Sequence, residues 1–369
     1  MADQLLKYKI AVGLIPGIGS VTAKKLIAYT GGIEGVFSEK KGKLQKIPGI
    51  GNVLAENIVN CKALERAGKE IEFIEKFHIG YSFYLDDDYP ERLKNCEDSP
   101  IMLYYKGNPS FNSKRILSIV GTRNATEYGR TCCERLIEDL KNRGHELVIV
   151  SGLAYGVDIC AHRAALKYGF ETFAVLGHGL GTLYPAVHKA TAKEIIAHGA
   201  LVSDFVSDTM PDRNNFVKRN RLIAGMADAT LVVESGLKGG ALITADLAQS
   251  YNRDVLAFPG RVGDAYSLGC NWLIKTNKAA LVESALDIEY HLGWDSPQKP
   301  VEAHQTSLFV EMTEDEQRIV KAFNGDKELP IDIISVRSEM PVGLVSAQLL
   351  SLEFAGKVKS LPGKMYRLL

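Results

Sequence analysis

The stretch Ile116-Leu117-Ser118-Ile119-Val120-Gly121-Thr122-Arg123 is a short apolar run that ends in a glycine and then a cation. Its near-continuous apolar character is typical of a strand in a parallel sheet that is covered on both faces. Similar runs follow along the chain, with helical segments between them: Leu147–Val150, Thr172–Leu176, Ala200–Ser203, Thr230–Val233 and Val255–Phe258. This alternation predicts an α/β domain with a doubly wound and mostly parallel sheet.

Small or polar residues follow most of these strands: Gly121, Ser151-Gly152, Gly177, Glu234-Ser235-Gly236 and Pro259-Gly260. In a doubly wound sheet, the ligand crevice lies at the carboxyl ends of the strands. We therefore expect a pocket lined by backbone at that edge of the sheet. Arg123 would sit at its mouth, where a guanidinium group can hold a phosphate with two hydrogen bonds.

Residues 214–225 read Asn-Asn-Phe-Val-Lys-Arg-Asn-Arg-Leu-Ile-Ala-Gly and predict a helix that Asn214 or Asn215 caps. Its apolar face would consist of Phe216, Leu222, Ile223 and Met226. Its first turns carry the cations Lys218, Arg219 and Arg221. A helix start already has partial positive charge, so an outside anion such as a phosphate would complete this cluster. A solvated basic face is the alternative, and Phe216 can either stack on a base or belong to the core.

Residues 1 to about 75 contain one pattern twice, in Leu14–Gly19 and in Lys46–Gly51. Each copy has the form Ile-Pro-Gly-Ile-Gly and precedes a helical period, Val21–Ile27 or Val53–Val59. The duplication is similar to tandem helix-hairpin-helix motifs, whose glycines allow a tight turn and leave amides for a phosphate. Such hairpins also serve as protein-interaction or purely structural units.

The carboxyl-terminal part is expected to form a winged-helix domain. Thr313-Glu314-Asp315-Glu316 starts a helix with an acidic first turn, and two further helical segments precede a hairpin that reaches Leu368. The segment Val342 to Phe354 has no Lys or Arg, which leaves a protein-interaction role open beside DNA reading. We expect a helical region at 1–78, the α/β domain at 79–292, a linker at 293–312 and the winged helix at 313–369.

The composition places limits on function. The 369 residues carry no net charge, so a nucleic-acid site would have to be a local patch. None of the six cysteines forms a Cys-x-x-Cys pair or a zinc-like set with His, so we expect reduced thiols and no metal. With no signal-peptide pattern and no apolar run near 18 residues, the chain is expected to be cytoplasmic and free of the membrane.

Three stretches are similar to enzyme motifs without completing them. The segment 177–182 has Thr182 where a dinucleotide fingerprint needs its third glycine, and the loop 234–245 lacks the Gly-Lys-Ser/Thr of a P-loop. Asp158 and His162 lie four residues apart and are either an acid/base pair or a buried structural hydrogen bond. We expect no catalytic site and no cofactor.

Taken together, these motifs resemble those of the DNA-processing protein A (DprA/Smf) family. The resemblance lies in residues 118–123, 150–154, 161–162, 174–177, 216–225, 242–245, 258–260 and 267–274. It implies a Rossmann-like domain that binds single-stranded DNA, forms a homodimer and loads RecA recombinase onto strands during natural transformation. The positions implied to contact or line the DNA site are Gly121, Thr122, Arg123, Phe216, Lys218, Arg219, Asn220, Arg221, Gly239, Gly240 and Thr244.

The chain departs from the family pattern at two places. Tyr155 stands where the Leu-Ala-Arg-Gly motif of the family has its Arg, so a ring that can stack replaces a cation. The second departure is Lys238-Gly239-Gly240-Ala241, which replaces a more usual Ser-Gly-Ser. The alternative function is that of a nucleotide-processing hydrolase of the phosphoribohydrolase type. Those enzymes use a Pro-Gly-Gly-x-Gly-Thr loop with a catalytic Glu, which this chain lacks, and Glu234 is the nearest candidate.

Overall fold

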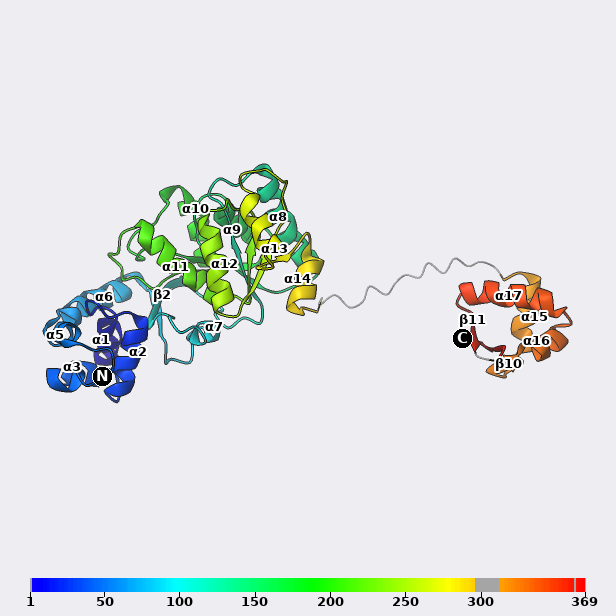
Figure 1. Ribbon diagram of the computed structural model, residues 1–369, viewed down its shortest axis with the longest axis horizontal. Coiled ribbons are helices and arrows are strands. Elements are labelled where there is room, and N and C mark those ends of the chain that lie inside the picture. Colours follow the sequence, from blue (N-terminus) through cyan, green and yellow to red (C-terminus); the bar gives the residue numbers. More distant parts are fainter. Residues whose placement is uncertain (1, 296–311, 362, 369) are drawn as a thin grey trace. The chain divides into compact units, whose positions relative to one another are not determined.

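The computed structural model describes residues 2–295, 312–361 and 363–368 (Figure 1). The chain divides into two compact units, Met1–Gln298 and Lys299–Leu369. The hairpin region and the α/β sheet belong to the first unit, so the predicted boundary between residues 78 and 79 stays a prediction.

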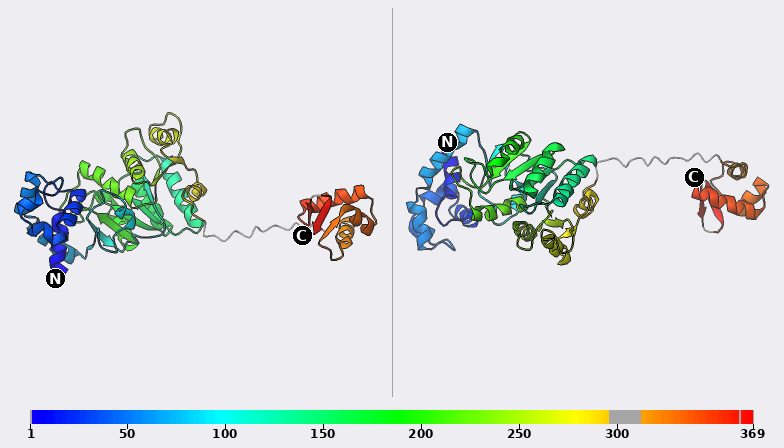
Figure 2. Two further views of the ribbon diagram at one scale, coloured as in Figure 1. Left: turned by 60° about the horizontal axis from the view of Figure 1, so that its bottom comes forward. Right: turned by 90° about the horizontal axis from the view of Figure 1, so that it is seen from above.

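The amino-terminal region is helical, and its blue ribbons gather together in Figure 2. Its helices are α1 (Ala2–Val12), α2 (Ser20–Tyr29), α3 (Ile33–Ser38), α4 (Lys41–Leu44), α5 (Asn52–Asn60) and α6 (Ala63–Phe77). Gly17 and Gly49 have φ of 80° and 91°, a left-handed conformation that explains the glycine of each hairpin. The predicted helices after the hairpins are confirmed as α2 and α5. Their buried faces are narrower than expected, because Val21, Val53 and Val59 are exposed.

The central sheet confirms the predicted parallel arrangement. Its strands are β1 (Gly80–Phe83), β2 (Met102–Gly107), β3 (Ile116–Val120), β4 (Val148–Ser151), β5 (Glu171–Val175), β6 (Gly199–Ser203), β7 (Ala229–Val232), β8 (Asp254–Ala257) and β9 (Ala280–Leu281). Their order across the sheet is β1-β2-β6-β5-β4-β3-β7-β8-β9. In this order, the seven strands from β6 through β3 to β9 run parallel to one another. The strands β1 and β2 add an antiparallel edge beside β6.

The strand order reverses between β3 and β7. From β3 the chain builds outward through β4, β5 and β6, and it then returns to place β7 on the other side of β3. Such a reversal opens a crevice at the carboxyl ends of the two central strands. The site is therefore expected where β3 ends at Val120 and β7 ends at Val232.

Helices cover both faces of this sheet, as Figure 1 and Figure 2 show. They are α8 (Glu127–Asn142), α9 (Val157–Lys167), α10 (Lys189–Ala197), α11 (Arg213–Gly225), α12 (Gly240–Ser250), α13 (Leu268–Lys275) and α14 (Ala285–Leu292). The short α7 (Glu91–Lys94) and the 3-10 turn η1 (Ala186–His188) lie in connections. Successive residues of β3 point to opposite faces. Ile119 packs in the core with α8, and Val120 packs in the core with Leu222 of α11.

The second unit has the helices and the strands of a winged-helix domain. Its elements are α15 (Glu314–Ala322), β10 (Glu328–Pro330), α16 (Ile331–Ser338), α17 (Val342–Phe354), β11 (Val358–Leu361) and β12 (Met365–Leu368). Thr313 and Glu316 form the capping box expected at the start of α15. The strands pair in the order β10-β12-β11, which confirms the predicted hairpin. Within the described parts of both units, none of the helices is sufficiently long and apolar to span a membrane.

Candidate nucleic-acid interface

A small pocket lies at the carboxyl ends of β3, β4 and β5. Part of its lining is backbone, as the glycine-rich strand ends predicted. Its lining residues come from the loops after these strands and from α11: Arg123, Gly152, Ala154, Tyr155, Tyr184, Pro185, Phe216 and Arg219. We call this the Arg123 pocket.

Arg123 and Phe216 form the charged and aromatic side of the Arg123 pocket. The guanidinium carbon of the exposed Arg123 lies 5.6 Å from the centre of the Phe216 ring. Phe216 is half-buried because it packs on Gly177, where a Cβ would lie 2.6 Å from the ring. Within residues 2–295 and 312–368, apart from 362, no carboxylate pairs with Arg123. The positive charge of Arg123 is thus open to an anion from outside.

Two tyrosines add aromatic surface to the Arg123 pocket. The Tyr184 ring lies 5.7 Å from that of Phe216 at an interplanar angle of 31°. Tyr155, at the position where the family pattern has Arg, is 48% exposed and meets His188 edge-on at 5.1 Å. The departure from the family pattern drew attention to Tyr155. The sequence gave no signal for Tyr184, which follows the incomplete dinucleotide fingerprint at residues 177–182. Rings that are partly exposed at a pocket mouth provide flat surfaces on which a base can stack.

Arg219 is directed into the protein, in contrast to the exposed cluster that we expected. It is 5% exposed and donates hydrogen bonds to the carbonyl oxygens of Gly152, at 2.8 Å, and Val175. Burial lowers the pKa of its guanidinium to about 10, and the nearby Asp158 carboxylate opposes that shift. Arg219 therefore remains charged at neutral pH and ties the loop after β4 to the end of β5, beneath the Arg123 pocket.

Arg221 is also committed to the protein. Its guanidinium is half-buried and donates hydrogen bonds to the Asp204 carboxylate and to the carbonyl oxygen of Asp98. The cap of α11 is Asp212, whose carboxylate accepts from the Asn214 amide at 2.8 Å, so the expected cap at Asn214 or Asn215 was wrong. The cluster of cations therefore has internal anions, and an outside phosphate is not needed to balance all of it.

Lys218 and Asn220 lie on other sides of α11. Lys218 is exposed, but it follows Phe216 by two residues, which places it about 200° around the helix axis. It therefore lies away from the Arg123 pocket. Asn220 is half-buried, and its side-chain oxygen accepts from Nε of Arg219 at 3.3 Å.

The remaining predicted residues lie around the ends of β3 and β7. The Thr122 amide donates to the carbonyl oxygen of Glu234 at 2.7 Å, which joins these two strand ends beyond the sheet. Gly121 fits against Val157, where a Cβ would be 2.4 Å from the valine side chain. Gly239, Gly240 and Thr244 lie at the start of α12, and the hydroxyl of the buried Thr244 donates to the Gly240 carbonyl at 3.4 Å.

Asp158 and His162 are not bonded to each other. The Thr172 hydroxyl donates to the carbonyl oxygen of Ile149 and so accepts from Nδ1 of His162, at 2.7 Å. Asp158 accepts from the Ala154 amide at 3.3 Å. Burial raises the pKa of Asp158 and lowers that of His162 to about 3, so the imidazole is neutral. The two residues are buried with separate partners, which departs from both sequence-based interpretations. Across the described segments, no group of three or more His, Cys, Asp or Glu is arranged to hold a metal.

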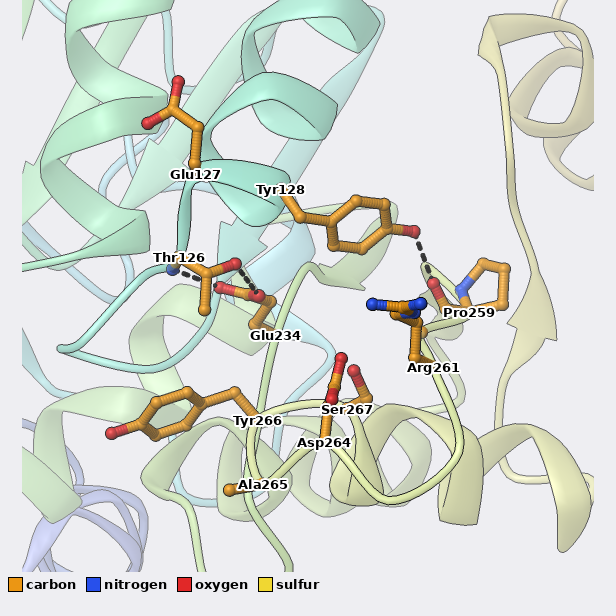
Figure 3. Close-up of a pocket in the computed structure, with 11 residues that line it drawn as sticks. Thr126, Glu127, Tyr128, Glu234, Pro259, Arg261, Asp264, Ala265, Tyr266 and Ser267 are labelled. Atoms are coloured by element: carbon orange, nitrogen blue, oxygen red, sulfur yellow. Dashed lines mark hydrogen bonds between the residues drawn. The ribbon is translucent and has the colours of Figure 1, made fainter.

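A larger cavity of about 770 Å³ lies beside the loop that follows β3 (Figure 3). Its lining consists of Thr126, Glu127, Tyr128, Glu234, Pro259, Gly260, Arg261, Asp264, Ala265, Tyr266 and Ser267. We call this the Glu234 cavity. The sequence showed that strand ends would meet here, but it could not show that Tyr128 of α8 and Tyr266 of a distant loop face the same space.

The fold and the site define a class of protein: in sequence order, a helix-hairpin-helix region, a Rossmann-like domain with a small cationic and aromatic pocket, and a winged-helix domain. Comparisons with known families make this specific. Residues 80–293 match DNA recombination-mediator protein A, residues 298–364 match the DprA winged helix domain, and residues 12–61 match a SAM-like helix-hairpin-helix tandem. The chain belongs to the DNA recombination-mediator protein A (DprA/Smf) family of DNA-processing proteins.

Individual relatives agree with this assignment. Protein Smf of Escherichia coli is 37% identical over 287 residues, which are 76% of this chain and 75% of that protein. The X-ray structure of DNA processing protein A from Streptococcus pneumoniae matches with a TM-score of 0.64 and 32% identity, over 77% of this chain and 97% of that one. A Helicobacter pylori structure that concerns the single-stranded DNA binding mode of its DNA processing protein A matches with a TM-score of 0.52 and 30% identity. It covers 58% of this chain and 96% of that one.

Proposed function

We propose that this chain binds single-stranded DNA at the Arg123 pocket. The observation that carries the proposal is the exposed Arg123 above the Phe216 ring, with no carboxylate partner in the described parts of the chain. A guanidinium can hold a phosphate oxygen pair, and the rings of Tyr155 and Tyr184 offer stacking surfaces to bases. Bases inside a duplex are already stacked and paired, so this combination favours a single strand. The Helicobacter pylori relative, described for its single-stranded DNA binding mode, supports this choice.

The geometry refines the set of residues that we propose for DNA contact. Arg219 and Arg221 act as positioning residues, because their guanidinium groups are already bonded within the protein. Gly121, Thr122 and Asn220 support the loop and the helix that present Arg123 and Phe216. Lys218 and the exposed Gly240 would meet neighbouring parts of the strand outside the Arg123 pocket.

A salt titration of binding tests this proposal. The anisotropy of a labelled single strand and of its duplex would be measured with the full chain at increasing salt. Each phosphate contact to a single strand contributes about −0.7 to the slope of log affinity against log salt. We expect tighter binding of the single strand and a slope that corresponds to several contacts. Equal affinity for the duplex, or no binding at low salt, would contradict the proposal.

Family membership supports a proposal for the wider role. We extend the proposal to a non-catalytic, cytoplasmic homodimer that loads RecA recombinase onto incoming strands in natural transformation. The test measures RecA assembly on a strand that a single-strand-binding protein already covers, with the ATP hydrolysis of RecA as the readout. Sedimentation measures the oligomeric state of the chain. Unchanged RecA assembly when the chain is added would remove the loading role.

The rival function is hydrolysis of a nucleotide in the Glu234 cavity. Both oxygens of Glu234 accept hydrogen bonds from Thr126, one from the amide at 2.8 Å and one from the hydroxyl at 2.5 Å. A carboxylate held in this way is less available as a catalytic base, which favours binding over catalysis. Release of free base from nucleoside monophosphates would overturn the non-catalytic proposal.

A further inference from the structure

The Glu234 cavity is separated from the Arg123 pocket by one loop, residues 123–126. On one side of this loop, the Arg123 guanidinium lies over Phe216. On the other side, the Asn124 side chain donates to the Tyr266 hydroxyl at 3.2 Å, and Thr126 bonds to Glu234. Three residues of chain span at most about 10 Å. A strand that is held at Arg123 can therefore reach the Glu234 cavity with its next nucleotides.

The walls of the Glu234 cavity suit a flat ring. Figure 3 shows Tyr128 and Tyr266 on opposite sides of the Glu234 carboxylate. The Tyr128 hydroxyl donates to the Pro259 carbonyl at 2.5 Å, which joins α8 to the loop after β8 and holds that ring in place. Aromatic rings that are fixed by their own hydrogen bonds provide stacking surfaces at little cost in side-chain entropy.

The charges in the Glu234 cavity disfavour a phosphate group. Its lining includes the acids Glu127, Glu234 and Asp264, against the single cation Arg261. An anionic group would meet net repulsion here, whereas a neutral ring that donates hydrogen bonds would not. The phosphates of a bound strand would therefore stay outside, near Arg123.

Glu234 gives the Glu234 cavity a preference among bases. Glu234 is 3% exposed as a whole residue, and each of its carboxylate oxygens accepts one hydrogen bond from Thr126. A carboxylate oxygen has two lone pairs, so each keeps one acceptor position. An exocyclic amino group is the natural donor, as in the pairing of Glu or Asp with the amino group of cytosine. Thymine carries a carbonyl oxygen at the corresponding position and would face the carboxylate with an acceptor.

We propose that the Glu234 cavity is a second base-binding site, which receives one amino-bearing base of the strand held at Arg123. This inference rests on the proposed binding of single-stranded DNA. The base of a free nucleotide has the same hydrogen-bonding groups as a base of the strand. Binding of a free nucleotide is therefore measured separately from binding of the strand.

The experiment compares single strands of about 12 nucleotides, oligo(dC) and oligo(dT), by fluorescence anisotropy with the full chain. Ala265→Trp fills the Glu234 cavity from an exposed lining position. Val262→Trp is the matched control, because Val262 is 98% exposed in the same loop and does not line the cavity. Glu234→Gln removes the negative charge and one of the two acceptor oxygens, and the Gln amide can still bond to both groups of Thr126.

We expect Ala265→Trp to weaken oligo(dC) binding about tenfold, the effect of losing one stacked base, with Val262→Trp unchanged. Glu234→Gln should weaken oligo(dC) about fivefold or more and leave oligo(dT) nearly unchanged. Unaltered thermal unfolding checks that the variants are folded. If Glu234→Gln does not fold, Ala265→Trp decides the question alone.

Three outcomes would overturn the inference. If wild type binds the strands and Ala265→Trp binds oligo(dC) equally well, the second base site is absent while the proposed function stands. If Ala265→Trp instead loses only the binding of deoxycytidine monophosphate, measured by saturation-transfer NMR, the cavity serves a free nucleotide and not the strand. If wild type binds neither strand, the proposed function fails, and this inference fails with it.

Discussion

The inner side of α11 and the surface of the Arg123 pocket contain the same kind of side chain in opposite situations. On the inner side, the Arg219 guanidinium is surrounded by carbonyl oxygens, and that of Arg221 meets the Asp204 carboxylate. At the pocket, the exposed Arg123 guanidinium lies over the Phe216 ring and has no carboxylate partner among the residues that the structure describes. The difference teaches that a basic motif mixes structural and binding cations. What separates them is whether the protein itself supplies the acceptors.

Mutations on the inner side of α11 should lower the stability of the fold more than mutations at the Arg123 pocket. In Arg219→Met, the carbonyl oxygens of Gly152 and Val175 lose the guanidinium that donates to them, and the buried Asp158 loses a nearby cation. Each buried acceptor that is left unsatisfied costs about 1–3 kcal/mol, which gives about 2–6 kcal/mol for the two. We expect the free energy of unfolding, from urea denaturation, to fall by about this amount. A loss below about 1 kcal/mol would contradict the structural role.

The buried His162 of α9, which bonds to Thr172 of β5, predicts a pH dependence. Burial holds the pKa of His162 at about 3 in the folded chain, against 6.5 for an ordinary histidine. Between these two pH values the unfolded chain binds the proton and the folded chain does not, so acid favours unfolding. The free energy of unfolding is therefore not lowered by His162 above pH 6.5. It falls as the pH is lowered from 6.5 toward 3, by up to about 1.4 kcal/mol per pH unit.

Unfolding titrations of wild type and His162→Gln over this range check the prediction. The comparison removes contributions that both proteins share, including that of Asp158. The wild-type slope should be the steeper of the two. Identical slopes would mean that His162 titrates normally in the folded protein.

At the Arg123 pocket, the expected effects concern affinity and not stability. Tyr155 is 48% exposed, so Tyr155→Ala should leave thermal unfolding nearly unchanged. Loss of one stacking ring should weaken single-strand binding about fivefold or more, without changing the salt slope. Tyr155→Phe keeps the ring and should bind like wild type, and Tyr155→Arg should instead steepen the slope. A salt slope that changes in Tyr155→Ala would contradict a stacking role.

The smallest effect is expected at Lys218, which lies about 200° around α11 from Phe216. Lys218→Ala should reduce single-strand affinity by about threefold or less, because an exposed cation outside the pocket contributes at most one screened phosphate contact. Anisotropy at low salt measures this. A loss larger than that of Tyr155→Ala would move the centre of the site to the other side of α11.

Much of the fold could be predicted from the sequence, because periodicity and glycine placement are local signals. The six runs from Ile116 to Phe258 are the six consecutive strands β3 to β8, and the Thr313 capping box marks the start of α15. The duplicated hairpins were clear for the same reason, since Gly17 and Gly49 both require positive φ. The lateral order of the strands, in contrast, depends on long-range packing and was not predicted.

The site was predicted in composition and only partly in geometry. Arg123 is at the predicted crevice because a strand end fixes its place. The directions of Arg219 and Arg221 could not be predicted, because their acceptors come from strands and loops far away in the chain. Tyr184 and Tyr266 were missed for a similar reason, since each lies in an irregular loop that carries no periodic pattern.

The central claim is that Arg123 is reserved for DNA while an equally charged residue of the basic motif is not. Single-strand affinity of Arg123→Ala and Arg221→Ala, measured side by side at one salt concentration, tests it directly because each variant removes one positive charge. We expect Arg123→Ala to lose about tenfold or more in affinity, and Arg221→Ala to stay within about threefold of wild type while it becomes less stable. Equal losses in the two variants, or a larger loss in folded Arg221→Ala, would contradict the account.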